Sequence, residues 1–335
     1  MRDILVPLAI DLAMPPLGSR LTKAEGRSMG TSWSAQMVVP PDVDVDLAAL
    51  LQRELDGVVE QMSHWDQDSL LARYNRAPAG SWHALPPEFF EVIDFALRVH
   101  DDSAGAYDPA AGLLVNLWGF GPTGRYSQAG FAAPGPDAVA AALAQRNHAT
   151  PQLDREGRRL LQPGGAVLDL SSIAKGYGVD RLGLCLERLG VRHYLVEVGG
   201  ELRGAGVKPG GEPWWVEIEG VPDAGYNPTR AIVALHGLAV ATSGDYRSYF
   251  HHGPRRISHT LDPRSGHPIA NHVASTTVVA STCMAADALS TALTVMGVDE
   301  GLAFADARGI AARYLVRRDG ALRESTSAAW RELLQ

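Results

Sequence analysis

The spacing of apolar positions predicts five helices. In 46–62, leucine and valine recur every three or four residues, as on the buried face of a helix. The segment 87–101 begins with a proline in its first turn, where a missing N–H is tolerated. Similar spacing predicts further helices at 135–147, 177–190 and 283–296.

Strands are predicted mainly in the second half of the chain, where β-branched and aromatic residues form short runs. These runs lie at 193–199, 214–220, 231–243, 275–282 and 312–318. The sequence RDGA from Arg318 is typical of a hairpin turn. Helices are concentrated early and strands late, with a few interleaved, so we expect an α+β fold and not a regular parallel sheet.

One predicted helix carries polar residues that can be interpreted in two ways. Asp287 and Thr291 are four residues apart within 283–296, so they point from the same side, and Gly297 is a natural stop. They form either an exposed polar stripe or part of a cation site, because oxygen ligands suit Mg²⁺ or Ca²⁺. The local pattern alone favours the stripe.

Composition excludes several classes of function. The chain has 335 residues and a formal net charge of -8, and no run of Lys or Arg is present, so we expect no nucleic-acid partner. Cys185 and Cys283 are not part of a CxxC pair, which makes a zinc site improbable. The first 20 residues are a poor secretory signal and no cysteine follows for a lipid anchor. We expect a cytoplasmic protein, or a periplasmic or membrane-associated form if the N-terminus has been processed.

Three stretches combine residues of unusual chemistry for a plain scaffold. In LDLSSIAKGYGVDRL (168–182), a strand end passes through small residues into a helix with Lys175 in its first turn, as in phosphate-binding loops. It is neither a Walker motif nor a GxGxxG fingerprint. The mixture of Gly, Tyr, Asp, Asn, Trp and Phe in GAYDPAAGLLVNLWGFGP (105–122) is more typical of a loop that binds a flat ring and a ribose than of a segment in the hydrophobic core. The region 241–269 places His259 among hydroxyl, acidic and arginine side chains, which fits an acid/base or phosphate-contacting role as well as a structural one.

Two further stretches have simpler interpretations. MGTSW (29–33) reads as a turn that leads into a strand. In MSHWDQDSLLARYN (62–75), Asp68 or Ser69 can cap a short helical turn.

Taken in order, these motifs resemble the FAD:protein FMN transferase (ApbE) family. The resemblance rests on MGT, DSLLARYN, GAYDPAAGLLVNLWGFGP, LDLSSIAKGYGVD, VEVGGELRGAG, ATSGDYRSYF, SHTLDPRSGHPI and ADALSTALTVMG, and it covers roughly residues 28–320. It implies a T-fold-related α+β architecture with a flavin-binding cleft between two sub-regions. We therefore expect an N-terminal extension at 1–27 and one transferase domain at 28–335.

The resemblance also implies a reaction and its residues. Members of the family bind FAD, use Mg²⁺ and transfer the FMN moiety to a Thr or Ser hydroxyl of a partner flavoprotein, releasing AMP. The implied metal ligands are Asp287, Thr291 and a backbone oxygen at Ser172. His259 is the candidate base, and Asp245 and Arg247 are expected on the same wall of the cleft as His259. The implied flavin-nucleotide residues are Met29, Trp65, Ala106, Tyr107, Asp108, Asp169, Lys175 and Ile269.

The acceptor implied by the resemblance carries an Asp-x-x-Ser/Thr-x-Ala-Thr pattern and is a redox-pump subunit or a related flavoprotein. DALSTALT partly resembles that pattern, but Leu293 stands where the acceptor Thr would be, so we do not expect self-flavinylation. Two alternatives stay open: an FAD pyrophosphatase that yields FMN and AMP, and an FAD-binding protein without turnover.

Overall fold

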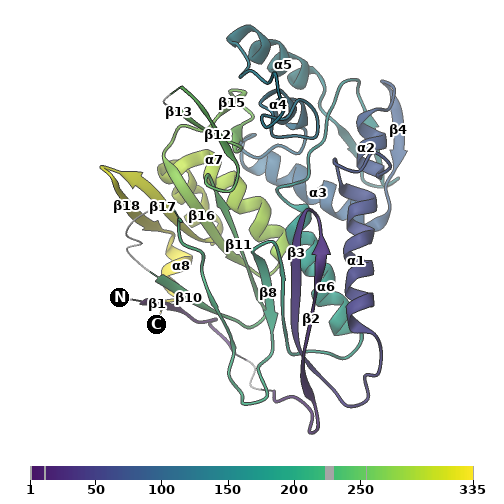
Figure 1. The fold of residues 1–335 in the computed structure, drawn as a ribbon, viewed down its shortest axis with the longest axis vertical. Coiled ribbons are helices and arrows are strands. Elements are labelled where there is room, and N and C mark those ends of the chain that lie inside the picture. Colours follow the sequence, from purple (N-terminus) through teal and green to yellow (C-terminus); the bar gives the residue numbers. More distant parts are fainter. Residues whose placement is uncertain (1, 11–12, 223–229, 254, 335) are drawn as a thin grey trace.

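The computed structural model describes residues 2–10, 13–222, 230–253 and 255–334. Its centre is an antiparallel sheet of eight strands in the order β18-β17-β16-β11-β8-β7-β3-β2 (Figure 1). The strands are β2 (Arg20–Ser28), β3 (Thr31–Val39), β7 (Tyr194–Val198), β8 (Glu201–Ala205), β11 (Leu238–Gly244), β16 (Val273–Ala280), β17 (Ala311–Arg318) and β18 (Ala321–Thr326).

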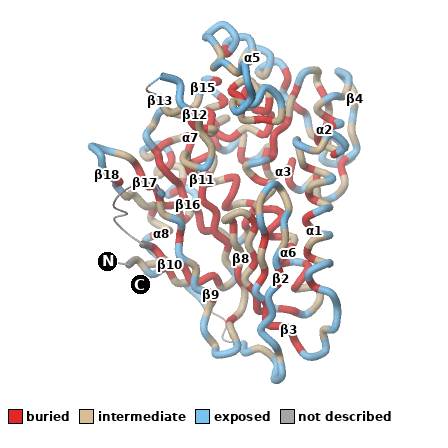
Figure 2. Tube along the Cα trace, in the orientation of Figure 1, coloured by how far each residue is buried: buried red, intermediate tan, exposed pale blue. Residues whose placement is uncertain are grey.

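Each face of this sheet is covered by a different layer. Helices α1 (Leu47–Met62), α6 (Ala174–Arg188) and α7 (Cys283–Arg308) pack on one face. A second sheet of β1 (Arg2–Leu5), β10 (Arg230–Leu235) and β9 (Trp214–Glu217) covers the other, together with α8 (Ala328–Glu332). One hydrophobic core lies between the main sheet and the helices, and another lies between the main sheet and the second sheet. Successive side chains of a strand point into these two cores in turn: in β11, Ala239 packs towards the helices and Val240 packs with Trp214. Buried residues accordingly run through the strands and the inner helix faces (Figure 2).

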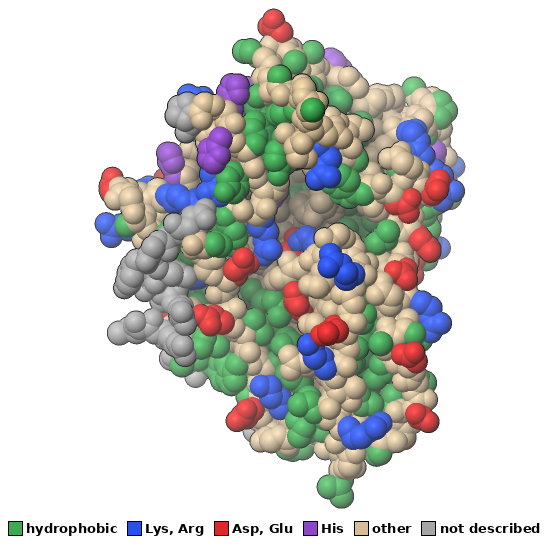
Figure 3. Space-filling model, in the orientation of Figure 1, with side chains coloured by type: hydrophobic (Ala, Val, Ile, Leu, Met, Phe, Trp, Pro, Cys, Tyr) green, Lys and Arg blue, Asp and Glu red, His purple; other side chains and the backbone are tan. Residues whose placement is uncertain are grey.

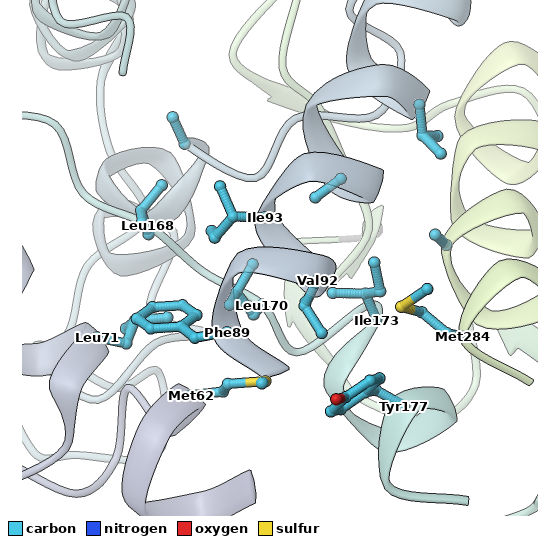
Figure 4. Packing of buried hydrophobic residues seen from close by; sticks show 14 of the residues in the cluster. Met62, Leu71, Phe89, Val92, Ile93, Leu168, Leu170, Ile173, Tyr177 and Met284 are labelled. Atoms are coloured by element: carbon cyan, nitrogen blue, oxygen red, sulfur yellow. The ribbon is translucent and has the colours of Figure 1, made fainter. Parts of the chain in front are cut away.

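A smaller region lies at one end of the helical layer (Figure 1). An apolar cluster connects it to α1, α6 and α7, with Met62, Phe89, Ile173 and Met284 packed together (Figure 4). Its helices are α2 (Leu70–Asn75), α3 (Pro87–Asp102), α4 (Gly112–Leu117) and α5 (Pro136–His148). Its strands are β4 (Ser81–Ala84), β5 (Gln152–Asp154) and β6 (Arg159–Gln162), and the hairpins β12 (Tyr249–His252)–β13 (Arg255–Ser258) and β14 (Leu261–Asp262)–β15 (His267–Pro268) lie beside it.

The expected α+β class is confirmed, and the differences lie in particular elements. The predicted strand 231–243 is two strands, β10 and β11, which are separated at His236 and Gly237. Helix α7 leaves helical geometry at Gly297 (φ 77°, ψ -175°), the predicted stop, and then resumes to Arg308. Strand β2 was not predicted, because it is an edge strand with mostly exposed polar residues, whereas β3 follows the turn predicted at 29–33. Residues 20–27, which the expected N-terminal extension includes, form most of β2.

Helix α7 is long and apolar enough to span a membrane, alone among the helices in the described ranges. More than half of its most apolar stretch (56%) is buried inside the protein. There it packs against α6 and the strands β11 and β16.

The start of α7 is held tightly against α6. The Asp180 carboxylate in α6 accepts hydrogen bonds from the backbone N–H groups of Cys283 (3.0 Å) and Met284 (2.8 Å). One turn earlier in α6, the helices come so close that a Cβ on Gly176 would lie 2.3 Å from the Cys283 carbonyl oxygen. A residue without a side chain is therefore required at 176.

We expect Gly176→Ala to destabilise the protein by about 1–3 kcal/mol, because the added methyl group overpacks the contact between α6 and α7. Gly57→Ala in α1 is the matched control, since its Cβ would meet open space. That change should stabilise the protein by roughly 0.5–1 kcal/mol through helix propensity. Urea denaturation of both variants measures the difference, and equal midpoints would contradict the close contact.

Candidate active site

A cavity of about 400 Å³ lies between the smaller region and the main sheet, where the surface is hollowed (Figure 3). Its wall includes the loop after α1, the loop before α4, the segment leading into α6 with its first turn, the start of β8, the strand β11 with the base of the β12–β13 hairpin, and α7. Most of the residues expected at the site line this cavity: Trp65, Ala106, Tyr107, Asp108, Asp169, Ser172, Lys175, Arg247, His259, Asp287 and Thr291.

The segment before α6 has one side in the core and one side in the cavity. Leu168 and Leu170 are almost fully buried in the apolar cluster, whereas Asp169 and Ser171 line the cavity. The Asn75 side chain fixes this segment, because its Oδ1 accepts from the Leu168 N–H (2.8 Å) and its Nδ2 donates to the Leu168 carbonyl (2.9 Å). This double hydrogen bond explains why the polar stretch 62–75 ends in asparagine. Ser69, one of the two predicted caps, accepts from the N–H of Ala72.

Asp169 forms a buried ion pair with His64, a residue that was not predicted. His64 Nδ1 lies 3.0 Å from Asp169 Oδ1, and both side chains are about nine-tenths buried. Burial alone would lower the pKa of His64, but the charge and hydrogen bond of Asp169 outweigh it and raise the pKa. Burial alone would raise the pKa of Asp169, but His64 and Ser171 lower it to about 2. Each partner therefore favours the charged form of the other.

Lys175 lies among carboxylates at the first turn of α6. Its Nζ is 2.5 Å from Oε1 of Glu201, which is buried at the start of β8. Burial alone would lower the pKa of Lys175, but the charges of Asp287 and Glu201 outweigh it and raise the pKa. Burial raises the pKa of Glu201, against the effect of Lys175. Glu201 was not predicted, because the short VGGE sequence that contains it does not indicate a partner as distant in the chain as Lys175.

The expected metal ligands present oxygen atoms to the cavity. Asp287 Oδ2 accepts the Gly176 N–H at 2.9 Å, and Thr291 Oγ1 lies 3.1 Å from Ser243 Oγ. Within the described chain, no hydrogen bond engages the Ser172 carbonyl oxygen, which a helix would normally pair with the N–H of Gly176. This donor set fits a hard cation that retains water or substrate oxygens. The described residues contain no cluster of three His, Cys, Asp or Glu side chains that would enclose a metal.

His259 is oriented by the backbone at the base of the β12–β13 hairpin. Its Nδ1 lies 3.0 Å from the Ser248 carbonyl oxygen, which can only accept, so Nδ1 carries the proton. In the neutral ring, Nε2 is then an unprotonated acceptor. Burial lowers the pKa of His259 to about 4. The residue is therefore a neutral base over the whole physiological pH range.

Three expected site residues lie outside the lining of this cavity. The Asp245 carboxylate pairs with Arg317 (2.6 Å), and the Ile269 N–H donates to the Thr260 carbonyl. Met29 lines a neighbouring cavity of about 780 Å³, which shares His64, Trp65 and Lys175 with the first.

Two further residues of the lining also have protein partners. Arg146 holds the Asp108 carboxylate at 2.6 Å, and Glu219 holds Arg247 at 2.6 Å. The ion pair with Arg146 therefore indicates that Asp108 fixes the conformation of its own loop. Arg247 is exposed at the edge of the cavity.

Comparison with known proteins gives a consistent result. The sequence model of the ApbE family matches residues 29–314. FAD:protein FMN transferase from Vibrio cholerae is 36% identical over 100% of this chain and 99% of its own length, and that from Haemophilus influenzae is 33% identical over 99% and 97%. The apo crystal structure of the Pseudomonas stutzeri flavinyl transferase ApbE superimposes with a TM-score of 0.84, at 38% identity over 96% of this chain and 98% of that one. The chain therefore belongs to the ApbE family.

Proposed function

We propose that the protein transfers the FMN moiety of FAD to a Thr or Ser hydroxyl of a partner flavoprotein and releases AMP, with Mg²⁺ bound. The observation that carries this proposal is that one cavity is lined by a cationic side chain, by oxygen donors that fit a metal ion and by a neutral imidazole. Lys175, Asp287 and His259 supply these three features. The names and full-length coverage of the relatives support the same reaction.

The residues divide the work of the reaction among them. The P–O bond to the AMP phosphate breaks as a new P–O bond to the acceptor oxygen forms, and the acceptor proton moves to His259 Nε2. Lys175, which stays protonated, offsets phosphate charge. The ion pair of His64 with Asp169 connects the loop after α1 to the segment before α6.

A divalent cation is needed in this cavity because its carboxylates would repel the substrate. Asp169, Glu201 and Asp287 all line it, so a pyrophosphate would meet like charges. Asp287, Thr291 and the Ser172 carbonyl would hold Mg²⁺, which would supply positive charge beside the phosphates.

The transfer itself is tested with FAD, Mg²⁺ and a small acceptor domain that carries the Asp-x-x-Ser/Thr-x-Ala-Thr pattern. We expect a fluorescent flavin band on a denaturing gel and an equal amount of AMP. AMP with free FMN and no band would favour the pyrophosphatase, and bound FAD with neither product would favour a binding protein.

We expect Asp287→Asn to reduce transfer at least a hundredfold, because a metal that stabilises the transition state contributes several kcal/mol. FAD affinity should fall much less, since most of the cavity wall remains. Chelation with EDTA should inactivate the wild type to a similar degree. Steady-state transfer assays and FAD titration measure the two effects.

Asp299→Asn is the control for this change, because Asp299 is an exposed residue further along α7. It should behave like the wild type. Undiminished turnover of Asp287→Asn with Mg²⁺ present would refute the metal assignment.

His259→Asn should slow transfer about 10²–10⁴-fold with little change in FAD affinity. Asparagine can retain a donor to the Ser248 carbonyl but has no group in place of Nε2, so the variant removes the base and keeps the local hydrogen bond. Single-turnover rates and FAD titration separate these effects. A variant that loses FAD would instead make His259 a binding residue.

The pH dependence provides a second readout for His259. A base acts when deprotonated, and burial places the pKa of this imidazole at about 4. Protonation of the base should therefore reduce kcat/KM only near pH 4, and not near 6.5. If kcat/KM of the wild type instead falls below about pH 6.5, and this fall is absent in His259→Asn, the imidazole is more exposed to solvent than its burial indicates.

A further inference from the structure

A basic segment interrupts an otherwise acidic chain next to the active site. Residues 246–261 contain three arginines, three histidines and no Asp or Glu, whereas the whole chain has a formal net charge of -8. This segment forms the hairpin β12–β13, in which Tyr249 pairs with Ser258 and His252 pairs with Arg255. On the face of the molecule that shows the hollow, His and Lys or Arg side chains gather over this hairpin (Figure 3).

One face of the hairpin is anchored to the protein. Phe250 has ring contacts with Phe120 (5.6 Å), Tyr126 (5.6 Å) and Phe131 (5.3 Å), and its cross-strand partner Ile257 joins the same cluster. The hairpin is therefore held in one position against the loop before α5.

Basic side chains lie on the other face of the hairpin and at its tip, where His251 pairs with Arg256 and His252 pairs with Arg255. His251, His252 and Arg255 are exposed. Arg256 lies over the ring of Tyr249 at 3.8 Å. Within the described part of the chain, no acidic side chain forms an ion pair with Arg255. Its charge is thus available to a partner.

The hairpin leads directly into the catalytic cavity. Ser248 precedes β12 and His259 follows β13, and both line the cavity. Each strand has four residues, so the exposed end is roughly 13 Å from His259. These basic side chains are therefore close enough to contact a macromolecule that delivers a hydroxyl group to His259.

We propose that the β12–β13 hairpin is the docking surface for an acidic segment of the acceptor protein. The proposal rests on the proposed transferase function and specifies how its protein substrate is recognised. Complementary charge at the edge of an interface accelerates association and selects partners. The basic area is short and belongs to an acidic molecule, which favours a local acidic protein segment over a nucleic acid or a membrane.

The test compares Arg255→Glu with Arg53→Glu, an exposed control on α1 with the same change of charge. The probe is the small acceptor domain with the Asp-x-x-Ser/Thr-x-Ala-Thr pattern, at saturating FAD and Mg²⁺ and at low salt. We expect Arg255→Glu to raise the KM for the acceptor about threefold to tenfold, with kcat and FAD affinity unchanged. Added salt should shrink the difference, and Arg53→Glu should stay within about twofold of wild type.

An unchanged KM in Arg255→Glu, or an equal rise in both variants, would overturn the proposal. Anisotropy titration of labelled acceptor measures binding without turnover, so the docking surface is tested even if wild type forms no covalent flavin and the proposed function fails. Equal acceptor affinity of wild type and Arg255→Glu in that titration would also overturn it. So would loss of binding to phosphatidylserine vesicles in Arg255→Glu with acceptor binding intact, since the surface would then serve a membrane.

Discussion

The active site depends on one buried carboxylate, Asp180, which is not itself part of the cavity wall. Helix α7 begins inside the protein, where its first N–H groups cannot be satisfied by water. Asp180 accepts two of them and is also held by Arg203 (3.0 Å). Burial raises the pKa of Asp180, and these hydrogen bonds oppose that effect. Because the start of α7 is fixed in this way, Asp287 comes to lie one turn later beside the first turn of α6, with Thr291 a further turn along.

The same backbone segments build both the core and the cavity. Leu168 and Leu170 pack into the apolar cluster, and Asp169 and Ser171 line the cavity. Asn75 ties this segment to α2 through two backbone hydrogen bonds. Packing and site geometry are therefore not independent here, and a loss of apolar contact beneath the segment would displace Asp169 and Lys175 together.

Helices with strong apolar periodicity, such as α1 and α3, could be predicted from the sequence. Most of the residues that line the cavity could be predicted as well, because they lie in the long motifs shared with the ApbE family. Strand β2 could not, because an exposed edge strand has no apolar alternation to detect. Nor could His64 and Glu201, whose importance arises from a partner that is distant in the chain: Asp169 for His64 and Lys175 for Glu201. Asp245 lies near the site in sequence, but its carboxylate binds Arg317 of β17. Contacts of this kind are set by tertiary packing and leave no local pattern.

The orientation of His259 is set by a main-chain carbonyl, that of Ser248, and by no side chain of its neighbour. Every amino acid at 248 would present the same oxygen. A substitution at 248 therefore leaves in place the hydrogen bond that orients the imidazole, and with it the direction in which Nε2 points.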